Sequence, residues 1–238
     1  MIFVIASAGL VAACGDDTPA ATQTTGVADA NDGLPGADPT LGDPTLGDAS
    51  IPDGTGECAP PEGSSVPKVE FAEGPAMCLE AGVVYTAVIE TNHGTLRVVL
   101  RPDIAPITVN SFVNLARFHY FDDTTCHRAV QHFVVQCGDP TGTGTGGPGY
   151  EFVDELAQIE PYRIGSVAMA NHGPNTNGSQ FFIITGDDGT MLDPNYTLFG
   201  QVDDNDLSMV AALEAISNPA DGPPLEPIDI LSVVIEER

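Results

Sequence analysis

The sequence predicts a mainly β domain, either a closed barrel or a sandwich, with two helices and a long N-terminal segment without regular structure. Three observations lead to this prediction. From about residue 83 onward, short runs rich in Val, Ile, Phe and Tyr alternate with Gly, Pro, Asn and Asp, which is typical of strands joined by turns. Only two segments place apolar residues at helical spacing. The 26 glycines and 20 prolines among 238 residues also disfavour long helices.

The first expected elements are a hairpin and a helix. Residues 83–91 have the β-branched, alternating pattern of a strand, His93-Gly94 supplies a turn, and residues 95–100 form the partner strand. Pro106 stands where a helix is expected to begin, and apolar residues then recur at helical spacing. The sequence therefore predicts a helix over residues 106–117, directly after the hairpin.

Six further strands and a second helix follow. The remaining apolar runs that we expect to be strands are residues 126–130, 133–136, 166–170, 181–185, 198–202 and 231–236. The second helix is expected over residues 206–216, where four apolar residues lie on one stripe: Leu207, Val210, Leu213 and Ile216. Successive residues of a strand face opposite ways, so one of Phe181 and Phe182 is expected in the core. Pattern alone does not choose between a barrel and a sandwich.

The chain is expected to have three parts: a signal peptide (1–13), a lipidated acidic low-complexity tether (14–80) and a folded domain (81–238). Residues 1–13 are apolar and end in small residues, as in a signal peptide. Val11-Ala-Ala-Cys14 resembles a bacterial lipobox, in which Cys14 becomes the lipidated first residue. The alternative is a frayed apolar terminus with an incidental cysteine, because the basic segment that usually begins a signal peptide is missing.

The tether is predicted from its composition. It is poor in aromatic residues and rich in Asp, Gly, Pro, Thr and Ala, and it contains the tandem repeat Asp38-Pro-Thr-Leu-Gly and Asp43-Pro-Thr-Leu-Gly. Such a segment buries too little apolar surface to offset the loss of chain entropy on folding. We therefore expect it to be disordered.

The charge of the chain excludes one class of partner. The chain has 7 Lys and Arg against 34 Asp and Glu, a formal net charge of -27. Phosphate binding needs a basic face, so nucleic acid is excluded. No apolar run is long enough to span a bilayer, so membrane contact is expected through the lipidated Cys14 only. We expect a monomer that is exported and anchored to the bacterial cell membrane as a lipoprotein.

Two long motifs carry a specific resemblance to a known family. Residues 126–139 read Cys-His-Arg-Ala-Val-Gln-His-Phe-Val-Val-Gln-Cys-Gly-Asp, and residues 166–183 read Ser-Val-Ala-Met-Ala-Asn-His-Gly-Pro-Asn-Thr-Asn-Gly-Ser-Gln-Phe-Phe-Ile. A third, shorter motif pairs Leu192-Asp193 with Phe199-Gly200. Together these motifs resemble the signatures of the cyclophilins, and the resemblance extends from about residue 83 to residue 236.

The resemblance implies a fold, an activity and a set of site residues. The fold is a closed eight-stranded antiparallel barrel capped by two α-helices. The activity is peptidyl-prolyl cis-trans isomerisation, which assists the folding of exported or cell-surface proteins that contain X–Pro bonds. Arg128 matches the family's catalytic arginine. The residues that match the proline pocket are Phe133, Val134, Phe182 and Leu192, and those that match the groove for the substrate backbone are Gln136, Ala170, Asn171 and Gln180.

Three positions depart from the best-studied members of that family. Met191 stands where many eukaryotic members have Trp, Tyr196 where they have His, and Val134 where a Met is usual. Tyr196 still supplies a polar tip over an apolar ring. A thioether neither stacks nor hydrogen-bonds as an indole does, so Met191 implies weak cyclosporin binding with catalysis intact.

The implied chemistry needs neither a cofactor nor a metal. An X–Pro bond isomerises over a barrier of about 18–20 kcal/mol, because its C–N bond is partly double. As the amide twists, the prolyl nitrogen becomes an acceptor, and a fixed guanidinium can donate to it. His127, His132 and His172 lack cysteines or carboxylates at ligand spacing, so we interpret them as loop or packing residues.

The remaining four cysteines are expected to be paired. Export places them in an oxidising compartment, where disulfides persist. Cys126 and Cys137 lie about equally far from the expected turn between the two motif strands, and a hairpin places such positions side by side. Cys58 and Cys78, which flank the entry to the domain, are the second candidate pair. The alternative for the first pair is two buried thiols.

Two other functions fit parts of the sequence. The first is a non-catalytic proline-peptide-binding module, or a holdase chaperone, that uses the same groove. Because Arg128 is retained, the enzyme is favoured over this module. The second is a structural envelope protein, which would explain the tether but not the matched groove residues.

Overall fold

The structure is a computed structural model that describes residues 54–156 and 160–238. Its strands are β1 (Tyr85–Thr91), β2 (Gly94–Leu100), β3 (Thr124–Thr125), β4 (Arg128–Val130), β5 (Val134–Cys137), β6 (Ser166–Met169), β7 (Phe181–Ile184), β8 (Leu198–Val202) and β9 (Asp229–Glu237). Its helices are α1 (Pro106–Arg117), α2 (Asp187–Thr190) and α3 (Leu207–Ala215), with a 3-10 turn, η1 (Asp204–Asp206), before α3. The expected signal peptide, Cys14 and the tether up to residue 53 lie outside the described residues.

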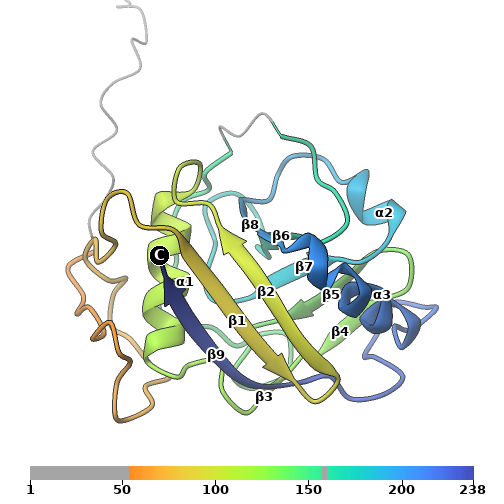
Figure 1. Ribbon diagram of the computed structural model, residues 1–238, viewed down its shortest axis with the longest axis horizontal. Coiled ribbons are helices and arrows are strands. Elements are labelled where there is room, and N and C mark those ends of the chain that lie inside the picture. Colours follow the sequence, from red (N-terminus) through yellow and green to blue (C-terminus); the bar gives the residue numbers. More distant parts are fainter. Residues whose placement is uncertain (1–53, 157–159) are drawn as a thin grey trace, which may run out of the picture. The chain divides into compact units, whose positions relative to one another are not determined.

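All the strands belong to one curled antiparallel sheet (Figure 1). The strand order is β3-β9-β1-β2-β8-β6-β7-β5-β4. The predicted closed eight-stranded barrel is therefore wrong in two respects. Among the described residues the sheet has nine strands, because the two-residue strand β3 precedes β4, which is the counterpart of the strand expected at residues 126–130. The hydrogen-bonded ladder does not close between β3 and β4, the two end strands.

Prolines before β9 explain why the ladder stays open. A proline has no N–H to donate to a neighbouring strand, and Pro223, Pro224 and Pro227 precede β9. β9 therefore pairs with β3 but does not continue along β4. The segment instead forms a loop beside β4, where the N–H of Ala129 donates to the carbonyl oxygen of Gly222 at 2.9 Å.

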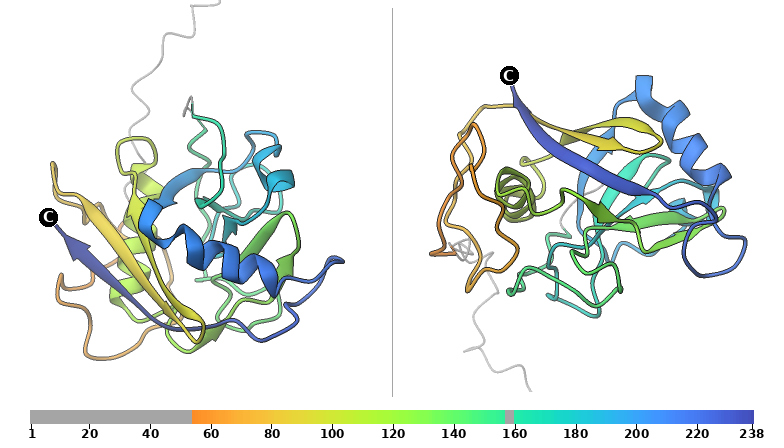
Figure 2. Two further views of the ribbon diagram at one scale, coloured as in Figure 1. Left: turned by 45° about the vertical axis from the view of Figure 1, so that its right-hand side comes forward. Right: turned by 90° about the horizontal axis from the view of Figure 1, so that it is seen from below.

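The curled sheet encloses an aromatic core, into which α1 packs through Phe112. The ring centroid of Phe112 lies 4.9 Å from that of Phe121, 5.5 Å from that of Phe181 and 5.2 Å from that of Phe199. All four rings are buried, so they contribute much of the apolar surface removed from water. Helices α1 and α3 lie at opposite ends of the curled sheet (Figure 2), and buried residues of both belong to the same core.

The N-terminus of α1 is capped by a residue far away in the sequence. Pro106 begins the helix, as the sequence predicts. The Glu155 carboxylate then accepts the N–H of Ile107 at 3.0 Å and the N–H of Thr108 at 2.8 Å. These are two of the donors that a helix start leaves without an intrahelical partner.

Among the described residues, no helix is long and apolar enough to cross a membrane.

Residues 54–80, which the sequence analysis places in the tether, pack against α1 (Figure 2). The N–H of Ala59 donates to Oδ1 of Asn114 at 2.7 Å, and the N–H of Cys78 donates to Oδ1 of Asn110 at 2.8 Å. Two asparagine side chains of the helix thus satisfy backbone donors of the preceding segment. Residues 54–80 therefore form an ordered arm beside the curled sheet.

The arm is closed by a disulfide between Cys58 and Cys78, which are 20 residues apart in the sequence. Replacing both cysteines by serine is expected to lower the free energy of unfolding by about 2–3 kcal/mol, because the bridge restricts the unfolded chain. Urea denaturation of the variant and the wild type measures this difference. Thiol titration must first show that the other disulfide is intact. An unchanged free energy of unfolding would contradict the prediction.

Candidate functional site

Strand alternation divides the apolar side chains between the core and a second, outer cluster. In β7, Phe181 lies in the core and Phe182 in the outer cluster, as the alternation of a strand requires. The buried members of the outer cluster are Val134, Tyr162, Ala168, Phe182, Ile184 and Leu198. Its partly buried members include Phe133, Ala170, Leu192 and Tyr196. The structure therefore brings together all four residues that the sequence analysis places in an apolar pocket.

Tyr162, which no sequence pattern predicts as a site residue, fixes one side of this outer cluster. Its hydroxyl donates to the carbonyl oxygen of Tyr196 at 2.6 Å and accepts the N–H of Tyr196 at 3.2 Å. The ring of Tyr196 in turn packs edge-on against Phe182, with the ring centroids 5.4 Å apart. Burial raises the pKa of Tyr162, so its hydroxyl stays protonated. No strand or helix pattern surrounds Tyr162, so no local signal identifies it.

Met191 does not join the cluster. It caps the short helix α2 and is 81% exposed, whereas the adjacent Leu192 is half-buried against the cluster. Its thioether is therefore available to solvent. Met191 is the most exposed of the predicted pocket and groove residues.

Arg128 stands on β4 opposite Gln136 on β5. Its guanidinium donates from Nε to Oδ1 of Asp221 at 2.6 Å and from Nη2 to Oδ2 of Asp221 at 2.9 Å. A longer hydrogen bond of 3.5 Å runs from Nη1 to Oε1 of Gln136, and the guanidinium carbon lies 5.6 Å from the ring centroid of Phe133. The hydrogen bonds to Asp221 raise the pKa of Arg128, so the guanidinium is charged at any ordinary pH.

A disulfide lies at the base of this strand pair. Cys126 precedes β4 and Cys137 ends β5, and the structure joins them with their Cα atoms 4.0 Å apart. Both cysteines are buried. The bridge thus links the two strands that present Arg128 and Gln136.

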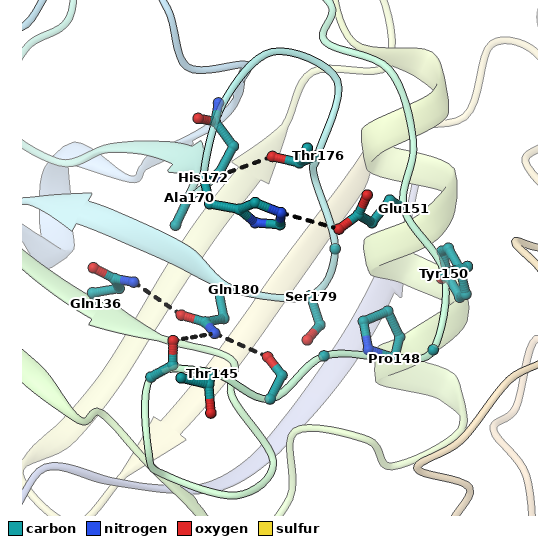
Figure 3. A pocket seen from close by; sticks show the side chains of 16 residues that line it. Gln136, Thr145, Pro148, Tyr150, Glu151, Ala170, His172, Thr176, Ser179 and Gln180 are labelled. Atoms are coloured by element: carbon teal, nitrogen blue, oxygen red, sulfur yellow. Dashed lines mark hydrogen bonds and ion pairs between the residues drawn. The ribbon is translucent and has the colours of Figure 1, made fainter.

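A chain of side-chain hydrogen bonds leads from Gln136 to a glycine-rich loop (Figure 3). Nε2 of Gln136 donates to Oε1 of Gln180 at 2.9 Å. Nε2 of Gln180 donates to the carbonyl oxygens of Gly144 at 3.1 Å and Gly146 at 2.9 Å. Both the oxygen and the nitrogen of the Gln180 side-chain amide are therefore hydrogen-bonded, which fixes its orientation.

A single buried carboxylate shapes that loop. Asp139 accepts the backbone N–H of Thr141 at 2.7 Å, of Gly144 at 2.6 Å and of Gly146 at 3.0 Å. Gly146 must lack a side chain, because a Cβ there would lie 2.0 Å from Oδ1 of Asp139. Burial by itself would raise the pKa of Asp139, but the hydrogen bonds from the loop outweigh it and lower this pKa to about 2.

This loop, the residues that follow β6 and the residues that precede β7 enclose a cleft of about 750 Å³. The predicted groove residues Gln136, Ala170, Asn171 and Gln180 all line it. Ala170 also borders the outer apolar cluster, so the cleft and the cluster adjoin each other. At the cleft, His172 faces Glu151 with Nε2 and Oε1 3.3 Å apart (Figure 3).

This arrangement suits binding and orientation of a peptide. It combines an apolar surface, a cleft of amide groups and one fixed guanidinium between them. Within residues 54–156 and 160–238, no group of three or more His, Cys, Asp or Glu side chains is placed to hold a metal ion. Transition-state stabilisation by hydrogen bonds to a neutral substrate is the chemistry that these groups can supply.

Comparison with known proteins identifies the family to which these features correspond. Residues 86–235 match the family model described as cyclophilin type peptidyl-prolyl cis-trans isomerase/CLD. A cyclophilin type peptidyl-prolyl cis-trans isomerase from Cryptosporidium parvum, known from a crystal structure, is 32% identical in sequence with a TM-score of 0.59. The match covers 65% of this chain and 99% of the Cryptosporidium chain. A second crystal structure of that protein, in the presence of the dipeptide Ala-Pro, is 33% identical with the same TM-score.

Curated bacterial relatives agree with this match. Peptidyl-prolyl cis-trans isomerase B of Streptomyces anulatus is 40% identical over 173 residues, which are 64% of this chain and 97% of the relative. Peptidyl-prolyl cis-trans isomerase A of Mycobacterium tuberculosis is 42% identical over 172 residues, 63% of this chain and 91% of the relative. "Probable peptidyl-prolyl cis-trans isomerase B" of the same species is 40% identical over 164 residues and 61% of this chain. The match spans only about half of that relative, 53% of its length.

The Asp139 carboxylate gives a test of how the cleft is held. Asp139→Asn is expected to lower the free energy of unfolding by roughly 2–3 kcal/mol at pH 7, because hydrogen bonds to a charged acceptor are lost. Because folding lowers the pKa of Asp139, its carboxylate contributes stability at pH values above the unfolded-state pKa, near 4. This contribution is lost as the pH falls towards the folded-state pKa of about 2. The difference between wild type and variant should therefore shrink between pH 4 and pH 2.

Urea denaturation at several pH values measures this effect. Asp204→Asn is the matched control, because Asp204 is exposed and makes no side-chain hydrogen bond within the described part of the chain. It should change stability little at any pH. A constant difference for Asp139→Asn down to pH 2 would show that the carboxylate's charge is not responsible.

Proposed function

The chain belongs to the cyclophilin-type peptidyl-prolyl cis-trans isomerase family, and on that premise we propose that it catalyses rotation about X–Pro bonds in exported or cell-surface polypeptides. One observation carries the proposal. A charged guanidinium, that of Arg128, is fixed at the edge of an apolar cluster and beside a cleft lined by amide groups. A related protein was crystallised with the dipeptide Ala-Pro, which supports X–Pro segments as the substrate class.

The apolar cluster would hold the proline ring. Phe133, Phe182 and Leu192 offer aromatic and aliphatic surface of the kind that binds a pyrrolidine ring through the hydrophobic effect. The cleft groups, among them Gln136 and Asn171, would hold the polypeptide on the other side of the bond. With the ring and one flank fixed, rotation is confined to the X–Pro bond itself.

Arg128 would lower the rotational barrier. In the planar amide, the prolyl nitrogen shares its lone pair with the carbonyl group and accepts no hydrogen bond. In the twisted transition state the lone pair is localised, and a guanidinium N–H of Arg128 can donate to it. Because this hydrogen bond strengthens only as the bond twists, it stabilises the transition state more than either ground state. No nucleophile and no proton transfer is required.

The catalytic role of Arg128 has a direct test. Arg128→Ala is expected to reduce kcat/KM on an Xaa-Pro peptide by about two to three orders of magnitude, which equals roughly 3–4 kcal/mol of transition-state stabilisation. Arg128→Lys should restore little, because an ammonium group does not reproduce the planar donor array. A protease-coupled assay or NMR exchange spectroscopy measures the rate.

Arg97→Ala is the matched control, because Arg97 is an exposed arginine on β2. It should leave the rate unchanged. Near-wild-type activity of Arg128→Ala would disprove the electrostatic mechanism. A wild type that binds Xaa-Pro peptides without isomerising them would instead support the binding-module or holdase function.

We further propose that the protein is exported and anchored to the bacterial cell membrane through a lipidated Cys14, and that it acts as a monomer. The lipobox-like residues Val11 to Cys14 support the anchor. Two disulfides, Cys58–Cys78 and Cys126–Cys137, support an oxidising compartment. An acidic chain with few cations is also a poor candidate for binding to anionic membrane surfaces, so the lipid would supply the attachment.

Anchoring through Cys14 can be tested in the native host. Wild-type protein should partition into detergent and incorporate radiolabelled palmitate, and Cys14→Ser should abolish the label. Cys126→Ser is a suitable control, because Cys126 lies within the folded domain and should not affect labelling. Unlabelled, soluble wild-type protein would refute the anchor without affecting the isomerase proposal.

A further inference from the structure

Asp221 holds the guanidinium of Arg128 more firmly than any other described group does. A guanidinium has five N–H donors, and the Asp221 carboxylate occupies one on Nε and one on Nη2 at 2.6 Å and 2.9 Å. Gln136 accepts a third from Nη1, but at 3.5 Å this hydrogen bond is weak. The Asp221 pair is bidentate, the geometry that fixes both the position and the plane of a guanidinium.

The loop that carries Asp221 is itself fixed to β4. On one side of Asp221, the N–H of Asn218 donates to the carbonyl oxygen of Ala129 at 2.9 Å, and the N–H of Gln131 donates to the carbonyl oxygen of Asn218 at 2.8 Å. On the other side, the carbonyl oxygen of Gly222 accepts the N–H of Ala129 at 2.9 Å. The carboxylate therefore stands on backbone tied to the same strand that carries Arg128.

We propose that Asp221 is a positioning residue that orients Arg128 for the isomerisation step. This assignment rests on the proposed isomerase function and adds a residue that no sequence motif indicates. The carboxylate fixes the guanidinium plane and leaves the remaining N–H groups free to donate to a substrate. Without it, Arg128 would sample other rotamers, and the donor would be misplaced when the amide twists.

Two opposing effects of the carboxylate have to be weighed. Its negative charge reduces the positive potential of Arg128, which by itself would weaken donation to the prolyl nitrogen. The Asp221 side chain is 69% exposed, however, so solvent screens this charge effect strongly. The hydrogen-bond geometry is not screened in this way, so orientation outweighs neutralisation. The same exposure means that the ion pair contributes little to overall stability.

The test compares Asp221→Ala, Asp221→Asn and Asp221→Glu with the wild type in kcat and KM on an Xaa-Pro peptide. We expect Asp221→Ala to lower kcat about tenfold with KM changed less than twofold, because the loss falls on the transition state. Asp221→Asn keeps the shape of the side chain and one acceptor oxygen, so its kcat should lie between that of Asp221→Ala and that of the wild type. Asp221→Glu restores a bidentate acceptor and should recover part of the loss.

A double variant separates positioning from a structural role. If Asp221 acts through Arg128, Asp221→Ala should have no further effect on the residual rate of Arg128→Ala. The thermal unfolding midpoint should also change little. Independently of turnover, the Nε–H of Arg128 should exchange with solvent faster in Asp221→Asn than in the wild type. Glu226→Ala is the matched control, since Glu226 is an exposed carboxylate of the same loop without an ion-pair partner among the described residues.

The outcomes are distinguishable. An active wild type with unchanged kcat in Asp221→Ala would overturn the assignment and leave the proposed function standing. A higher kcat in that variant would show that neutralisation outweighs orientation, and an additive loss in the double variant would show a structural role; both overturn the assignment. An inactive wild type would overturn the proposed function, and the assignment with it.

Discussion

The alternation of side chains along curled strands is the constraint on which the rest of this structure depends. Each strand has two faces, so every strand that contributes to the aromatic core must also present residues on the opposite face. Phe181 and Phe182 are neighbours in β7, yet one lies in the core and the other in the outer apolar cluster. Val134 and Val135 divide in the same way on β5. The candidate pocket is thus the outer face of the strands whose inner face forms the core.

Polar groups complete the site because they form one connected series. Asp139 holds the glycine-rich loop, the loop's carbonyl oxygens hold Gln180, and Gln180 accepts a hydrogen bond from Gln136. Gln136 stands opposite Arg128, and Asp221 accepts two further N–H groups of the Arg128 guanidinium. A buried carboxylate at one end and an exposed carboxylate at the other therefore fix the two sides of the site. Such a series limits the rotamers available to each member, which is what a preorganised site requires.

The arm at residues 54–80 extends the described fold beyond the part that matches the family model. Phe71 of the arm is buried with its ring centroid 6.2 Å from that of Tyr150, a residue that also lines the cleft. The N–H of Phe71 donates to the carbonyl oxygen of Pro148, another residue of the cleft wall. The arm thus packs behind the cleft wall, and none of its residues belongs to the outer apolar cluster.

The sequence by itself determined every described strand except the two-residue β3, the two longer helices and the apolar pocket residues, because these depend on local periodicity and on the three motifs. Tertiary structure decided the rest. The ladder stays open because the prolines before β9 have no N–H to donate to a neighbouring strand. This lack of donors has an effect only in the folded chain, where β9 lies beside β3. Glu155, Tyr162 and Asp221 act on residues 34 to 93 positions away in the sequence. Contacts over such separations leave no periodic trace in the sequence, since only folding brings the partners together.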